Sequence, residues 1–152
     1  KALIYSKLGA KVTSINTEKA DSLMVALASD RYYIENAPFR HIADCPFVIV
    51  WGDTTESAED RYGNIPLFAH MINITVVCEG DEPVTIFRQC ARYVRAICEI
   101  VYETPGVSAG SSEADHSYMA IQRVDYSESL PVANRLRKAA TIQVKYITDE
   151  KN

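Results

Sequence analysis

The segment EPVTIFRQCARYVRAICEIVYE, residues 82–103, predicts one long amphipathic helix around which the rest of the chain is arranged. Asp81 is a suitable N-cap residue, and Pro83 fits the first helical turn because its nitrogen needs no hydrogen-bond acceptor there. The sequence Thr-Pro-Gly at 104–106 ends the helix. Residues at helical spacing give it a continuous apolar face: Phe87, Cys90, Ala91, Val94, Ile97, Cys98 and Val101.

Two strands are expected before this helix. Residues 47–51, FVIVW, form an unbroken β-branched and aromatic run, which predicts a strand covered on both faces. In residues 68–78 apolar side chains alternate with a set that is more polar and is expected to face solvent, which predicts a strand of an antiparallel sheet. The two strands are expected to pair as a hairpin, with residues 52–64 as a long loop at its tip.

Two further strands are expected after the helix. Residues 117–126 carry a strand pattern whose apolar phase slips midway, and a β-bulge near Gln122 and Arg123 explains the slip. In residues 140–146 apolar and polar side chains alternate more regularly than anywhere else in the chain, which predicts the last strand. These two strands are expected to form a second hairpin.

The N-terminal region gives weaker patterns. Residues 11–15 are interpreted as a short strand, residues 18–29 as a helix capped by Asn16 or Thr17, and residues 30–44 as a loop. Together the patterns predict a single α+β domain over residues 1–152. Its core is an antiparallel four-stranded sheet of two hairpins, packed by the long helix and accompanied by a shorter N-terminal helix.

Composition narrows the function classes. The chain of 152 residues has a formal net charge of −4, which disfavours tight binding to duplex DNA because that needs clustered basic residues. Its apolar runs fall short of the roughly 20 residues of a membrane-spanning helix. The four cysteines lack zinc-site spacing and are interpreted as small thiols in a reducing compartment.

The histidines and cysteines give no catalytic signature. His41 and Cys45 lie close together beside Asp44, but a nucleophilic Cys-His pair is usually assembled from distant segments, so a packed loop is the preferred interpretation. His70 shares a strand face with apolar residues and is expected to be a core or interface histidine. Phosphate-binding, nucleophile-elbow and zinc-protease motifs are missing from the sequence. We therefore expect no enzyme, no metal and no cofactor.

The loop after the first predicted strand is strongly acidic. A solvated hairpin tip is the simplest interpretation of this charge. The alternative is a projecting arm that docks on a second subunit or partner, because ordering a long tip costs backbone entropy. The candidate interface residues are Asp53, Glu56, Glu59, Asp60 and Arg61.

The order of these segments resembles a known protein family. PFVIVWGD (46–53) and FAHMINITVVCEGD (68–81) precede the long helix, and SYMAIQRVDYSES (117–129) and RKAATIQVKYITDE (137–150) follow it. This arrangement, over residues 17–148, is similar to the small α+β neck proteins of tailed bacteriophages, the tail terminator or tail-completion family.

The resemblance implies a structural, non-enzymatic protein of the virion, assembled in the host cytoplasm. Such proteins form a ring, commonly a hexamer, that caps the tail tube protein and joins it to the head-proximal connector. The genome passes through the channel without specific binding, and an acidic wall suits such a passage because it repels DNA. The family offers no catalytic residue to carry over.

Two alternatives remain open at the level of sequence. One is a small cytoplasmic α+β enzyme or ligand-binding domain, which the fold class does not exclude. The other is a different ring component, such as a head-completion or tail-tube protein.

Overall fold

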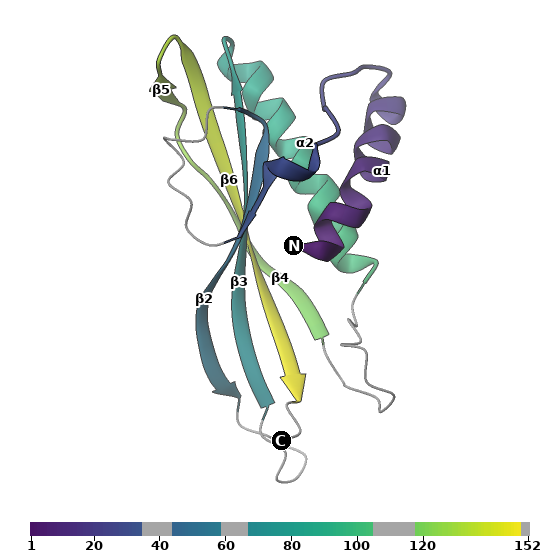
Figure 1. The fold of residues 1–152 in the computed structure, drawn as a ribbon, viewed down its shortest axis with the longest axis vertical. Coiled ribbons are helices and arrows are strands. Elements are labelled where there is room, and N and C mark those ends of the chain that lie inside the picture. Colours follow the sequence, from purple (N-terminus) through teal and green to yellow (C-terminus); the bar gives the residue numbers. More distant parts are fainter. Residues whose placement is uncertain (35–43, 59–66, 105–117, 150–152) are drawn as a thin grey trace.

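The computed structural model describes residues 1–34, 44–58, 67–104 and 118–149. Two helices, α1 (Ala2–Lys19) and α2 (Pro83–Tyr102), lie on one side of a mixed six-stranded sheet (Figure 1). The strands run in the order β1-β2-β3-β6-β4, and β5 pairs with β6 beside the end of β4. Their bounds are β1 (Tyr32–Ile34), β2 (Phe47–Ala58), β3 (Leu67–Gly80), β4 (Tyr118–Tyr126), β5 (Leu130–Val132) and β6 (Arg135–Asp149).

The predicted α+β class is confirmed, but the expected four-stranded antiparallel sheet is too small. Its four strands are present as β2, β3, β4 and β6, and neighbouring members pair antiparallel. Two short strands extend them: β1 pairs parallel to β2, inside the predicted loop 30–44, and β5 lies between β4 and β6 in sequence. β1 is held in place by Tyr32, which is buried and meets the ring of Tyr5 edge to face at 5.2 Å.

The N-terminal prediction is wrong in detail. The expected strand over 11–15 is part of the helix α1, which ends at Lys19. The expected helix over 18–29 does not form, because residues 20–28 are irregular. The apolar stripe that decides α1 is Ile4, Leu8, Val12 and Ile15, all buried. Asn16 does not cap a following helix; its side chain bonds both main-chain groups of Met24, at 2.8 and 3.2 Å, and so holds the segment after α1.

The long helix is confirmed, with small shifts at its ends. Glu82, not Asp81, is the N-cap residue, and Pro83 occupies the first turn as expected. On its outer face Arg95 and Glu99, four residues apart, form an ion pair at 2.8 Å. Arg95 also reaches Glu18 of α1 at 2.6 Å, and this contact lowers the pKa of Glu18 to about 2. The outer surfaces of the two helices are thus linked by charge.

Both faces of the sheet are buried in the part that the two helices cover. Towards the helices, β2, β3 and β6 contribute Val48, Val76 and Ile142 to the main core, where they pack against α1 and α2. On the opposite face Phe47, Ile49 and Val77 form a second, smaller buried cluster. The prediction that residues 47–51 form a strand covered on both faces is therefore confirmed for its buried part, 47–49.

Tyr93 of α2 connects the helix layer to the segment that follows α1. Its ring is fully buried, and its hydroxyl accepts a hydrogen bond from Val25 N–H at 3.0 Å and donates one to Val25 C=O at 2.5 Å. Burial raises the pKa of this phenol, so it stays protonated and can donate across the ordinary pH range.

We expect Tyr93→Phe to destabilise the fold by about 1–3 kcal/mol, because the two polar groups of Val25 lose their partner. Urea unfolding followed by far-ultraviolet circular dichroism measures this loss. Tyr126→Phe is the matched control, since Tyr126 is exposed and should tolerate loss of its hydroxyl. Equal stability of the two variants would contradict the role assigned to Tyr93.

Candidate functional site

The central strands are longer than the helices that cover them. With 20 residues, α2 is about 30 Å long, whereas the 14 residues of β3 span about 46 Å. Figure 1 shows the result: β2, β3 and β6 continue well past the helices, accompanied by the start of β4. We call this part the sheet extension and define it as residues 51–58, 67–72, 118–121 and 143–149.

A row of rings lies on the face of the sheet extension that continues the helix side. The ring of His70 lies 6.5 Å from that of Phe68 and 6.1 Å from that of Tyr146, both in stacked orientation. Its Nδ1 is 3.0 Å from the hydroxyl of Thr55 on the neighbouring strand. His70 therefore shares a face with apolar residues, as predicted, and it is partly exposed rather than buried in the core.

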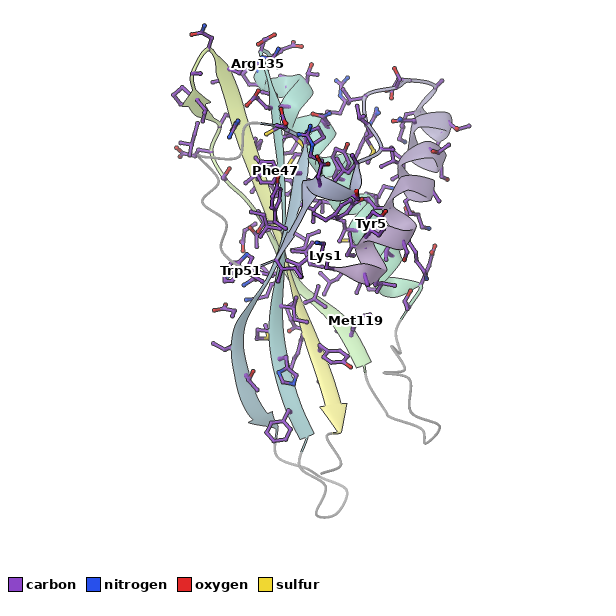
Figure 2. The ribbon with its side chains drawn as sticks, in the orientation of Figure 1. Lys1, Tyr5, Phe47, Trp51, Met119 and Arg135 are labelled. Atoms are coloured by element: carbon purple, nitrogen blue, oxygen red, sulfur yellow. The ribbon has the colours of Figure 1, made fainter. Side chains whose placement is uncertain are left out.

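An apolar cavity of about 210 Å³ lies where the sheet extension leaves the helices. Ile4 of α1, Val101 of α2 and Val144 of β6 contribute to its wall. Lys1 and Met119 also line it, and Figure 2 shows Lys1 beside the middle of the sheet with Met119 farther along on β4.

A second recess, of about 440 Å³, lies over the sheet extension, where residues 50–55 of β2 line it together with His70 of β3 and Tyr146 of β6. Trp51 belongs to its lining, and the buried indole Nε1 has no hydrogen-bond partner among the described residues. A buried indole N–H normally finds an acceptor, so this group has unused capacity to donate. The pairing of β2 with β3 is also irregular here, with a register shift between Gly52 and Thr55.

The predicted acidic site is only partly described. Asp53 is exposed on β2. Glu56 belongs to the same strand and pairs with Ala69, which corrects the expectation that residues 52–64 are all loop. The strand continues because the long neighbour β3 supplies hydrogen-bond partners for it. Glu59, Asp60 and Arg61 lie outside the described residues.

The groups considered for chemistry do not assemble into a reactive site among the described residues. Cys45 is half-buried, and desolvation raises the pKa of its thiol to about 11, the opposite of what a nucleophilic cysteine needs. Asp44 pairs with Arg31 at 3.2 Å, and His41 lies outside the described residues. Within the part of the chain that is described, His, Cys, Asp and Glu side chains form no group suited to a metal ion.

Sequence reasoning missed two features of this region. It treated residues 53–58 as loop, although Thr54 and Thr55 favour strands and a strand as long as β3 needs a partner of similar length. It also did not place Tyr146 beside His70, because that contact depends on the register between β6 and β3. The regular alternation along both strands was the available signal.

Comparisons with known proteins add no assignment: no family model matches the chain, and no curated protein sequence matches it. Neither helix of the described chain is long and apolar enough to cross a membrane.

Cys45 provides a test of the unreactive thiol. With a pKa near 11 rather than 9.0, its thiolate population at neutral pH falls about a hundredfold. We expect iodoacetamide to alkylate Cys45 slowly in the folded chain and much faster in urea, as followed residue by residue by mass spectrometry. Rapid labelling in the folded chain at neutral pH would reopen the nucleophile hypothesis.

Proposed function

We propose that this protein is a structural, non-enzymatic component of the head–tail junction of a tailed bacteriophage. In this role copies of the chain form a ring, with a hexamer as the expected number. The ring ends the tail tube, joins it to the head-proximal connector and leaves a channel for the genome. The proposed location is therefore the virion, after assembly in the host cytoplasm.

The sheet extension is the observation that carries this proposal. A domain that functions alone gains little from strands about 16 Å longer than its covering helix, because their partly exposed aromatic face stays in contact with water. A subunit of a ring, in contrast, can cover such a face with its neighbours. The order of strands and helices along the chain, which first suggested the neck proteins, supports the same proposal.

The charge of the molecule is compatible with a channel for DNA. The formal net charge of one chain is −4. A ring multiplies this charge by the number of subunits, so an acidic lining would repel the phosphates and keep DNA from adhering. In this proposal the ring needs neither a cofactor nor a specific contact with the nucleic acid.

Light scattering coupled to size exclusion tests the ring. We expect a discrete oligomer, about six times the 17.0 kDa of one chain, whose mass stays constant on dilution. Negative-stain electron microscopy should show closed rings with a central hole. A monomer at all concentrations would contradict the proposal and would favour the alternative of a small enzyme or ligand-binding domain.

The acidic residues of the candidate interface can be tested separately. We expect Asp53→Ser combined with Glu56→Ser to leave folding nearly intact, because Asp53 is exposed and an exposed charge contributes at most about 1 kcal/mol. Assembly or partner binding should weaken instead, as measured by light scattering and by thermal unfolding of the same samples. The control is Asp30→Ser with Glu128→Ser, which removes two exposed acids elsewhere. Loss of folding with normal assembly of the remainder would contradict an interface role.

A further inference from the structure

The described sheet has two open edges. On one side β1 covers β2 only from Val48 to Val50, so beyond Val50 no described strand pairs with the outer edge of β2. On the other side β4 pairs with β6 alone among the described strands. An open edge presents unpaired backbone N–H and C=O groups, which makes it a site for adding a further strand.

The two open edges stand at the same level along the sheet. The register can be followed from one edge to the other: Gly52 pairs with Ile72, Ile72 with Val144, and Val144 with Ile121. One step farther along, Thr55 is connected through His70 and Tyr146 to Met119 in the same way. The free part of β2 therefore matches the first half of β4.

The two edges also bend at that common level. β2 shifts register between Gly52 and Thr55, and β4 shifts between Ile121 and Arg123. Such bulges bend a strand and increase its twist. β1 covers the edge of β2 up to Val50. A strand added to the free part of this edge therefore has to bend away from β2 where β1 begins, and the register shifts in β2 and β4 supply such a bend.

Strand direction and charge both favour contact between the β4 edge of one copy and the β2 edge of another. β2, β3, β6 and β4 alternate in direction, so β4 of one copy runs antiparallel to β2 of the next when the helices of both stay on one side. β2 carries two acids, Asp53 and Glu56, and no basic residue, so two β2 edges repel each other.

A β4 edge supplies the complementary charge. It carries Arg123, whose side chain is 66% exposed although it also contacts Asp125 at 2.6 Å. The ladder through Asn73 and Gln143 puts Arg123 at the level of Trp51, about 7 Å along the strand from Asp53. That distance is within reach of an arginine side chain.

Each of the two edges also has exposed apolar side chains beside it, and these lie at the same level along the sheet. Phe87 and Tyr126 contact each other at a ring distance of 5.4 Å beside the end of β4, and both are more than 40% exposed. On the opposite flank Tyr5 and Ile34 are at least half exposed. The register places Tyr126 level with Val48, the partner of Tyr32 in β1, so the two apolar flanks also stand at one level.

We infer that the β4 edge of one copy of this chain adds to the free β2 edge of a second copy, which joins neighbouring sheets head to tail. Residues 118–123 of the first copy pair with residues 51–58 of the second, and Arg123 meets Asp53. This inference rests on the proposed ring and specifies its subunit contact. The same contact, repeated around an axis, makes each interface use two different surfaces of the chain.

Cross-linking between two variants, each with one added cysteine, tests the contact. Thr54→Cys and Gln122→Cys place a thiol on each edge, at exposed positions. The two chains are mixed, allowed to exchange subunits and treated with a short bis-maleimide. We expect a covalent dimer joined between positions 54 and 122, with a yield about tenfold above that of either variant alone, because assembly raises the local thiol concentration. The parent chain, with its four native cysteines, gives the background.

Three outcomes would overturn the inference, and they differ in what they say about the ring. Cross-links within the Gln122→Cys sample alone would mean that two β4 edges pair symmetrically. A discrete oligomer without a 54–122 cross-link would reject the edge contact and leave the ring proposal standing. A monomer by light scattering would reject both. As a matched control, Thr13→Cys on α1 replaces Thr54→Cys and should give only background.

Discussion

The antiparallel ladder between β3 and β6 holds the other elements in position. The two strands pair without interruption from Leu67 with Asp149 to Gly80 with Leu136. β2 attaches to the free side of β3, β4 attaches to the free side of β6, and α2 packs over both central strands. A shift of one residue in this ladder would turn Ile142 and Val144 away from the helices, so burial of the core fixes the register.

The same ladder produces the sheet extension. Helix α2 advances 1.5 Å per residue and a strand about 3.3 Å, so an element of 20 residues cannot cover strands of 14 and 15 residues along their whole length. The aromatic row around His70 and the open part of β2 both belong to the uncovered part. They are consequences of one mismatch in length, and the proposed subunit contact makes use of it.

The sequence predicted the parts of the fold in which one apolar pattern is strong. The alternation in β6 and the slip near Gln122 were interpreted correctly, because a side chain on the wrong face would be costly there. The stripe on α2 was correct for Cys90, Val94, Ile97 and Val101. It was wrong for Phe87, which is exposed, and it missed the buried Tyr93. α1 was missed because Val12, Thr13 and Ile15 favour a strand locally, whereas packing against α2 makes them helical. The edges of the sheet were not predictable, since an open edge depends on which strands are neighbours.

The central place of β6 has a consequence for synthesis. β6 is the last of the described strands to leave the ribosome, yet it lies between β3 and β4. Until it arrives, β3 has only β2 as a partner, and the apolar face of α2 has no β6 surface to pack against. The nascent chain therefore displays an unfinished sheet until β6 has been synthesised, and a chaperone that shields apolar segments during that interval would act on β3 and α2 first.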